Sequence, residues 1–274
     1  MGFDPLSAAR WGGQLTMLTL SSIAKNFGGL QVLQDVSLAI PERGIFGLIG
    51  PNGAGKTTVF NLISGLLAPS AGVIEFHGQA LTGLAPHRIT RLGIARTFQN
   101  IRIFKEMSLL ENVLVAIGRQ GNSGAVSFLL PSAKLRATQR SERAAAKELL
   151  ARVGLADKAE LLAGKLSYGE QRRLEIARAL ATAPKLLLLD EPAAGMNGAE
   201  KQQLMEEIVK LEASGLALLI IEHDMRFVMG LCHEIAVLNF GQLIAQGAPA
   251  AIRADRQVIE AYLGDDGDGE KSRS

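Results

Sequence analysis

Apolar residues recur at every second position in two segments near the start of the chain. Leu18 and Leu20 begin the first segment, and Val36 and Leu38 belong to the second, a spacing typical of strands with one buried face. The residues at 27–29, a phenylalanine followed by two glycines, predict a turn between them. We therefore expect antiparallel strands at the beginning of the fold.

Three later segments are almost entirely apolar: residues 44–49, 186–189 and 216–221. They are too short for ordinary helices and lie beside helical patterns, which is typical of buried parallel strands. The first is followed by residues 56–67, where apolar side chains recur at spacings of three and four and predict a helix. Strands that alternate with helices indicate an α/β core.

A long helical block interrupts this core. Residues 108–183 carry apolar stripes at helical spacing, with a break at residues 121–131. We expect the block to form a second lobe, after which the core resumes. Shorter elements are expected around it: strands at 73–76 and 94–98, a helix at 88–92, and a hairpin of residues 234–238 and 242–245.

The composition supports a compact fold and excludes several other classes of protein. The 274 residues are 47% hydrophobic and 20% charged, which excludes a disordered or coiled-coil chain. A net charge of +2 without a basic tail gives no support for direct binding of nucleic acid. Because Cys232 is the only cysteine, the chain has no intramolecular disulfide and no cysteine-built metal site, and a reducing, cytosolic setting is expected.

The two ends of the chain predict neither a signal peptide nor a membrane anchor. No apolar run reaches the roughly 18 to 20 residues that a spanning helix needs. Residues 1–16 lack the apolar core of a signal peptide and are expected to form a loose extension, with Met17 as an alternative start. Residues 265–274 are expected to be a flexible tail. The remaining residues, 17–264, are expected to form the folded domain.

Residues 50–58 match the phosphate-binding pattern G-x-x-x-x-G-K-[ST] between a predicted strand and a predicted helix. Backbone N–H groups of such a loop surround phosphates, and the helix N-terminus favours negative charge. Lys56 would hold the outer phosphates and the Thr57 hydroxyl would bind Mg²⁺. The alternative, a glycine-rich turn without a ligand, is disfavoured by this context. The residues expected to contact nucleotide here are Gly50, Pro51, Asn52, Gly53, Ala54, Gly55, Lys56, Thr57 and Thr58.

Two acids, Asp190 and Glu191, follow the second apolar strand. They are expected at the carboxyl edge of the sheet, where α/β proteins bind ligands. Asp190 suits Mg²⁺ held through water, and Glu191 suits the polarisation of an attacking water. Alone they could be solvated acids at the start of a helix, but the phosphate-binding loop favours a catalytic role.

A third motif, residues 166–171, begins a predicted helix. Ser167 and Glu170 have the spacing of a capping box, which is a sufficient structural explanation. Ser167 and the Gly169 amide would also form an anion site at the helix N-terminus. The chain's own nucleotide does not need a second phosphate site in the helical block. Such a site is explained if it contacts the nucleotide of another subunit.

Together these motifs resemble the ATPase subunit of an ABC transporter, in the family's order and over nearly the whole chain. The resemblance implies a P-loop NTPase fold with a RecA-like α/β core, an antiparallel β subdomain and a helical signature subdomain at about residues 105–183. It assigns the following motifs: Walker A at 50–58, the Q-loop glutamine Gln99, the signature at 166–171, Walker B at 186–191 and the switch histidine His223.

The resemblance also implies how the site works. In that family two ATPase subunits close head to tail, with each ATP between one subunit's Walker A and the other's signature. Ser167, Gly169 and Glu170 would then act in trans. Gln99 would contact Mg²⁺ and couple it and the attacking water to the membrane partner. His223 would contact the γ-phosphate of ATP.

Two residues differ from those that are commonest in the family. Phe27 matches the aromatic residue that stacks on adenine, although Tyr is commoner there and a lone Phe is more often a core residue. Asn197 stands where many members have a D-loop Asp, so communication between the two sites would be altered. Residues 94–100, 191–197 and 258–264 nevertheless resemble one subgroup, the ATPases of branched-chain (hydrophobic) amino acid importers.

The resemblance therefore implies a peripheral ATPase at the cytoplasmic face of the inner (plasma) membrane that powers uptake of branched-chain or other hydrophobic amino acids. Its expected partners are two integral membrane permeases, a second ATPase subunit, in a hetero-dimer rather than a homo-dimer, and a periplasmic or extracellular solute-binding protein. Alternatives are an importer of another solute such as urea or amides, and a soluble ABC ATPase that acts on nucleic acid or ribosomes. A P-loop kinase or GTPase would leave Gln99 and the signature without a role.

Overall fold

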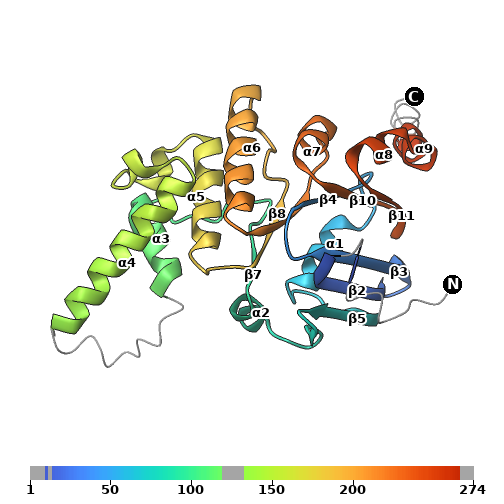
Figure 1. Ribbon diagram of the computed structural model, residues 1–274, viewed down its shortest axis with the longest axis horizontal. Helices are drawn as coiled ribbons and strands as arrows, with labels where there is room; N and C mark the ends of the chain where they lie inside the picture. Colours follow the sequence, from blue (N-terminus) through green and yellow to red (C-terminus); the bar gives the residue numbers. More distant parts are fainter. Residues whose placement is uncertain (1–9, 12–13, 119–132, 266–274) are drawn as a thin grey trace.

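A computed structural model describes residues 10–11, 14–118 and 133–265 of the chain. Two sheets, one antiparallel and one mainly parallel, lie side by side with helices around them (Figure 1). The chain therefore has the expected α/β fold, with an antiparallel β subdomain and a helical lobe.

The first sheet is antiparallel. It consists of β1 (Arg10–Trp11), β2 (Gln14–Phe27), β3 (Leu30–Pro41), β5 (Ala71–Phe76) and β6 (Gln79–Ala80). β2 pairs with β3 on one side and with β5 on the other. The pairing starts earlier than the sequence suggested, because Arg10 pairs with Leu15 and Thr16 pairs with Pro41. Part of the expected loose extension is thus strand, whereas residues 1–9 lie outside the described residues.

The second sheet has the strand order β11-β10-β4-β9-β8-β7, and all its pairs are parallel except the β10–β11 hairpin. The three apolar runs lie next to one another at its centre, with β9 between β4 and β8. The strands are β4 (Ile45–Ile49), β7 (Ile94–Arg96), β8 (Leu186–Asp190), β9 (Ala217–Ile221), β10 (Glu234–Asn239) and β11 (Gln242–Gly247).

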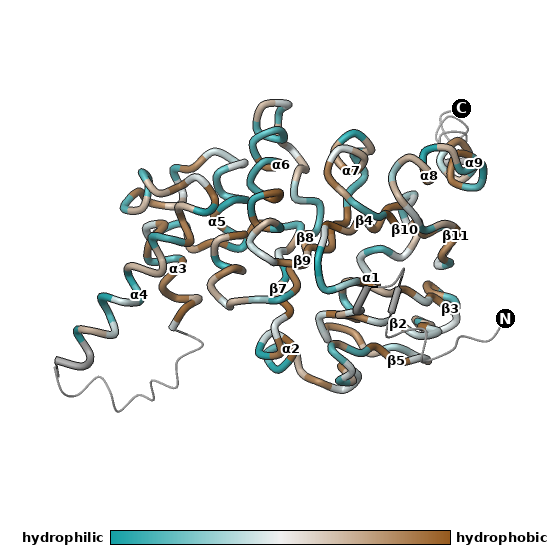
Figure 2. Tube along the Cα trace, viewed as in Figure 1, coloured by the Kyte–Doolittle hydropathy of each residue, from teal (hydrophilic) through white to brown (hydrophobic). Residues whose placement is uncertain are grey.

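Side chains of the central strands point alternately into two hydrophobic cores. In β8, Leu186 and Leu188 pack in the core shared with the antiparallel sheet, whereas Leu187 and Leu189 pack in the core shared with the helices. All four are completely buried. Hydrophobic residues accordingly concentrate along the central strands (Figure 2). Because both faces of the sheet are covered, these strands are continuously apolar instead of alternating.

Helices cover both faces of the parallel sheet and form a separate lobe (Figure 1). On the face of the antiparallel sheet lies α1 (Lys56–Ile63), and on the opposite face lie α6 (Gly198–Ala213), α7 (Met225–Leu231) and α8 (Pro249–Ala254). The lobe contains α3 (Leu109–Gly118), α4 (Ala133–Arg152) and α5 (Tyr168–Leu180). The other helices are α2 (Pro86–Leu92) and α9 (Arg256–Asp265). None of the described helices is both long and apolar enough to cross a bilayer.

Two elements end earlier than the sequence predicted. The helix expected over residues 56–67 ends at Ile63, because Gly65 has a φ of 71° and a Cβ there would lie 2.9 Å from a backbone carbonyl oxygen. The strand expected over residues 94–98 ends at Arg96: the N–H of Thr97 still bonds to Leu188 of β8, but the backbone of Phe98 bonds to side chains of α5 instead. The expected break in the lobe and the tail beyond α9 lie outside the described residues.

Candidate functional site

The sheet order brings three of the motifs to one edge. β4, β9 and β8 are adjacent and parallel, so the segments that follow them leave the sheet at the same end. Those segments are the phosphate-binding loop after β4, His223 after β9, and Glu191 after Asp190, the last residue of β8. The N–H of Glu191 donates to the carbonyl of Ile221 at 2.9 Å and joins two of these segments directly.

The phosphate-binding loop has the backbone conformation that its glycines predict. Gly50, Gly53 and Gly55 have φ values of 148°, 79° and 101°, which residues with side chains rarely adopt. The Lys56 ammonium donates to the carbonyls of Gly50 at 2.7 Å and Pro51 at 2.9 Å, so it points into the loop. Helix α1 begins there without a side-chain cap, and its first N–H groups face the loop. This arrangement fits a phosphate.

The other residues of the loop differ in exposure. Asn52 and Thr57 are exposed and Thr58 is half-buried, so all three can be reached from solvent. Ala54 is buried, and its carbonyl accepts a hydrogen bond from the N–H of Gly241 at 3.1 Å. The tip of the β10–β11 hairpin therefore supports the loop, a contact that the sequence did not indicate.

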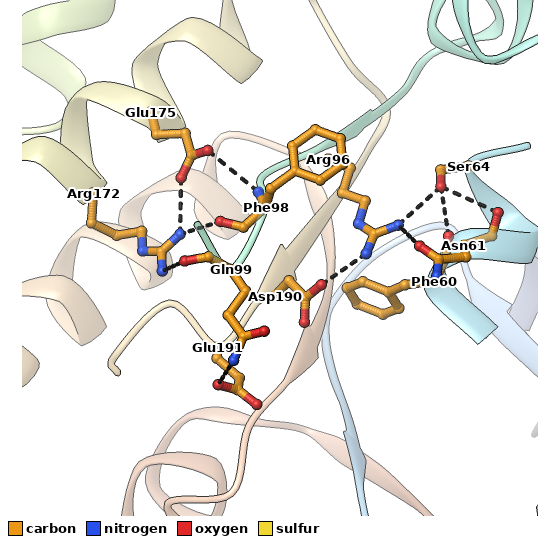
Figure 3. A network of polar contacts seen from close by, with 10 residues as sticks. All are labelled: Phe60, Asn61, Ser64, Arg96, Phe98, Gln99, Arg172, Glu175, Asp190 and Glu191. Atoms are coloured by element: carbon orange, nitrogen blue, oxygen red, sulfur yellow. Dashed lines mark hydrogen bonds and ion pairs between the residues drawn. The ribbon is translucent and has the colours of Figure 1, made fainter. Parts of the chain in front are cut away.

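Asp190 is held by an arginine that the sequence reasoning missed. Arg96 donates from Nη2 to Asp190 at 2.8 Å, and both side chains are almost completely buried (Figure 3). Its Nη1 donates to Asn61 at 2.7 Å and to Ser64 at 3.1 Å, both at the end of α1. The guanidinium also lies 5.5 Å from the ring centre of Phe60. Arg96 thus links the helix of the phosphate-binding loop to the acid of β8.

Gln99 and Glu191, predicted separately as catalytic residues, contact each other. The amide Nε2 of Gln99 donates to Glu191 Oε2 at 2.9 Å (Figure 3). Glu191 has a φ of 47°, a left-handed conformation that costs a non-glycine residue about 1–3 kcal/mol. The backbone is therefore held in an unfavourable conformation that directs this carboxylate toward Gln99.

His223 is exposed beside a buried acid. Its side chain is 63% exposed, whereas that of Glu222 is 1% exposed. Glu222 accepts hydrogen bonds from the N–H of Ala193 at 2.7 Å and the N–H of His223 at 3.2 Å. Burial raises the pKa of the Glu222 carboxyl, although these N–H groups oppose the shift. Glu222, which the sequence reasoning did not select, fixes the backbone from which the His223 ring projects.

Phe27 lies at the end of β2 and is 46% exposed. The ammonium of Lys25 lies 5.0 Å from its ring centre. Phe27 is therefore a surface residue and not part of the core. Its position is compatible with the expected stacking on a base, which remains a prediction.

The capping box at the start of α5 is confirmed. Ser167 Oγ accepts the N–H of Glu170 at 3.3 Å, and Glu170 accepts the N–H of Ser167 at 3.0 Å. Partial burial opposes ionisation of Glu170, but bonds from the Lys158 ammonium and from Ser167 outweigh it and lower its pKa. Gly169 is buried, and a Cβ there would lie 3.1 Å from Glu200. Ser167 is exposed.

Comparisons with known proteins agree with this geometry. The model of the ABC transporter family matches residues 33–194, more than half of the 274 residues. The chain belongs to the ABC transporter family. A second family model, described as a branched-chain amino acid ATP-binding cassette transporter, matches residues 242–268.

Individual relatives cover almost the whole of this ABC protein. It is 44% identical over 250 residues to the high-affinity branched-chain amino acid transport ATP-binding protein BraF of Pseudomonas aeruginosa, over 91% of this chain and 98% of BraF. An ABC transporter cassette in its ADP conformation matches with a TM-score of 0.80 and 31% identity, over 92% of this chain and 100% of that one. A dimeric cassette bound to ADP and Pi has a TM-score of 0.71 and 25% identity, over 85% of this chain and 99% of that one. The chain is an ATP-binding ATPase subunit.

The ABC protein uses Asn197 of its D-loop to cap its own helix. The Asn197 side chain accepts the N–H of Glu200 at 3.0 Å, and Glu200 accepts the N–H of Asn197 at 3.0 Å. An aspartate at this position would cap α6 equally well. The departure from the commoner Asp therefore leaves the local structure intact.

Proposed function

We propose that this ABC ATPase powers an importer of branched-chain or other hydrophobic amino acids. The contact between Gln99 and Glu191 carries the proposal of hydrolysis, because it fixes a carboxylate at the edge of the sheet where the Walker A loop also lies. The choice of solute is supported by the identity with BraF and by the match of residues 242–268.

We call the sheet edge that carries the Walker A loop, Glu191 and His223 the nucleotide edge. Each of its residues has a distinct role in this proposal. Lys56 holds the outer phosphates, and His223 contacts the γ-phosphate from its exposed position after β9. Glu191 accepts a hydrogen bond from the attacking water and Gln99 orients it. Phosphoryl transfer depends on such positioning and on charge neutralisation more than on covalent help.

The donor set at this edge fits Mg²⁺. The Thr57 hydroxyl, the Gln99 amide oxygen and the Asp190 carboxylate are hard oxygen ligands of the kind that Mg²⁺ prefers. No group of three His, Cys, Asp or Glu side chains that could hold a metal occurs in the part of the chain that the structure describes, so phosphate oxygens would complete the set. Bound Mg²⁺ would neutralise phosphate charge.

A second ATPase subunit is part of the proposal. Ser167 begins α5 in the helical lobe, and β7 and β8 separate this helix from α1 (Figure 1). This separation supports the proposal that the signature serves the nucleotide of another subunit and not that of its own Walker A loop. A head-to-tail partner would bring each signature to the other subunit's nucleotide, with the related cassette dimer as a precedent for association.

A groove of about 950 Å³ lies between the lobe and the segment formed by α2 and β7. His87, Arg91, Arg102, Arg178 and Lys185 line it and give it a basic character. We assign this groove to the cytoplasmic segment of a membrane permease, which would place the ATPase at the inner face of the membrane. A segment with acidic residues would match the charge of the groove.

Purification of the tagged chain from its native membrane in mild detergent tests the assembly. Two integral permeases and a second ATPase are expected to remain bound. Ribosomal proteins or nucleic acid without a permease would overturn the transport function and leave the ATP chemistry intact.

Uptake measurements test the solute. Cells that lack the gene are expected to lose uptake of labelled leucine, isoleucine and valine, and to regain it with the wild-type chain but not with Glu191→Gln. Loss of urea or amide uptake with normal uptake of branched-chain amino acids would support the alternative importer.

A further inference from the structure

The backbone of the Q-loop is held by two buried side chains of α5. Arg172 is completely buried and donates from Nη1 to the carbonyl of Phe98 at 2.5 Å and from Nη2 to the carbonyl of Gln99 at 2.8 Å (Figure 3). Glu175, one turn farther along α5, accepts from Arg172 at 2.9 Å and from the N–H of Phe98 at 3.4 Å. Two consecutive residues of the Q-loop are thus bonded to a single helix.

Gln99 is consequently held at both ends. Its carbonyl is bonded to Arg172 of α5, and its side chain is bonded to Glu191 after β8. Ser167, the residue that we expect to meet the partner's nucleotide, is the N-cap of helix α5. A displacement of α5 at that end would move the backbone of Gln99, and with it the group that contacts Glu191.

The chemistry of the pair explains why an arginine is required. A guanidinium offers a planar fork of donors, and this one reaches two carbonyls and a carboxylate at once. The ammonium of a lysine could not make the same three bonds from one position. A buried ion pair by itself adds little stability over apolar packing, so the value of this pair lies in the geometry that it imposes.

We propose that Arg172 and Glu175 are positioning residues that set Gln99 against Glu191 and connect the signature end of α5 to the hydrolytic centre. They do not contact nucleotide and act through Gln99. The inference deepens the proposed function and rests on its assignment of Gln99 and Glu191 to hydrolysis.

The first test is a double-mutant cycle on the full chain. In Arg172→Lys we expect the kcat of ATP hydrolysis to fall about 10- to 100-fold, with little change in the KM for ATP, because misplacement of Gln99 affects the transition state and not the binding of nucleotide. In a Gln99→Ala background the same change should have no further effect, since the residue through which it acts is already removed. Single-turnover measurements keep the slow variants measurable.

Arg173→Lys is the matched control. Arg173 is the next residue of α5 and forms an equally close ion pair, at 3.0 Å, with Glu207 of α6 instead of the Q-loop. It is largely buried, so the change costs comparable packing. We expect it to affect the melting temperature but to leave kcat within about twofold.

Hydrogen exchange gives a readout that does not depend on activity. The amides of residues 98–100 should exchange faster in Arg172→Lys than in the wild type or in Arg173→Lys, because the carbonyls of Phe98 and Gln99 lose their bonds to Arg172 and this segment opens more often. Glu175→Gln is a second variant, which keeps the size of the side chain and loses the charge that fixes Arg172. The same kinetic pattern is expected for it.

Either of two results would overturn the inference: a loss of kcat that is fully additive with Gln99→Ala, or unchanged exchange at residues 98–100 in both variants of the pair. A general loss of folding would instead lower the melting temperature and raise exchange throughout α5 in the control as well, and would assign the pair a purely structural role. Membrane purification and uptake do not involve these variants, so the transport proposal and this inference can fail separately.

Discussion

The nucleotide edge of the core and the N-terminal end of α5 are built in opposite ways. At the nucleotide edge, hydrogen bonds join residues far apart in the sequence: Arg96 to Asp190 across 94 positions and Gln99 to Glu191 across 92. At the start of α5, the capping bonds join residues only three positions apart. The first site exists only when the whole core is folded, whereas the second is complete within one helical turn.

The two regions also differ in exposure. Asp190 is 3% exposed and held by a buried arginine, whereas Ser167 is exposed at the end of its helix. The buried Arg96–Asp190 pair fixes the strand end from which Glu191 projects, whereas His223 at the same edge is open to solvent. An exposed helix start can accept a phosphate from another molecule. This difference is consistent with the proposal that one subunit supplies chemistry at the first region and recognition of the partner's nucleotide at the second.

Removal of the Glu191 carboxylate should have the largest effect. In Glu191→Gln, turnover is expected to fall by about 100- to 1,000-fold because the amide is a poor acceptor for the attacking water. ATP affinity should change by less than about twofold, since Glu191 acts in the transition state. Phosphate release and equilibrium dialysis measure the two quantities, and Glu106→Gln, an exposed acid before α3, is the control. Normal turnover would remove Glu191 as the group that polarises water.

A bulky side chain at the N-cap of α5 should lower turnover almost as much, but only in the dimer of two ATPase subunits. Ser167→Arg is expected to leave ATP binding to the isolated subunit intact and to lower turnover by about 100-fold, because a bulky cation prevents closure on the partner. Ser167→Asn, which still caps the helix, is the control for lost capping. Dimerisation with ATP in the Glu191→Gln background gives the second readout. If Ser167→Arg still dimerises and hydrolyses, the signature does not act in trans.

Replacement of Arg96 tests how far the core site depends on distant contacts. In Arg96→Lys one ammonium cannot bond to Asp190 and to both α1 acceptors, Asn61 and Ser64, so buried polar groups lose partners. We expect the free energy of unfolding in urea to fall by about 1–3 kcal/mol. Arg91→Lys, exposed on α2, should stay within about 0.5 kcal/mol of the wild type. An equally stable Arg96→Lys would show that the link between α1 and β8 is dispensable.

Removal of the Asp224 charge should have the smallest effect on stability. Asp224 has two roles, as the cap of α7 and as the partner of Lys201, and only the second depends on its charge. It accepts the N–H of Phe227 in α7 and pairs with Lys201 at 2.6 Å. The Lys201 bond is the main cause of a pKa below the ordinary 3.8, and burial opposes it. The stability from this shift is therefore present above about pH 4 and lost as the pH falls through the lowered pKa.

Asp224→Asn keeps the cap and removes the charge. We expect a loss of about 0.5–1 kcal/mol in unfolding free energy at pH 7, and a smaller difference from the wild type below pH 4. Urea unfolding at a series of pH values measures it. A difference that is constant down to pH 3 would show that ionisation of Asp224 is not the source of the stabilisation.

Much of the fold could be predicted because burial leaves a periodic trace in the sequence. The continuously apolar residues 186–189 and 216–221 predicted parallel strands covered on both faces, and they form β8 and β9. The ends of helices and strands were harder to predict. The helix after the Walker A loop ends at Ile63, before the left-handed Gly65, although the apolar periodicity continues to residue 67.

The sequence by itself determined the motifs whose physics is local. The Walker A glycines set a loop conformation, and Ser167 with Glu170 forms a cap within one turn, so both can be recognised from adjacent residues. Only the tertiary structure decided which side chains meet at the nucleotide edge. The partners of Asp190 and Glu191 come from strands and loops about ninety positions away, and the sheet order that joins them follows from packing, which a one-dimensional pattern does not specify.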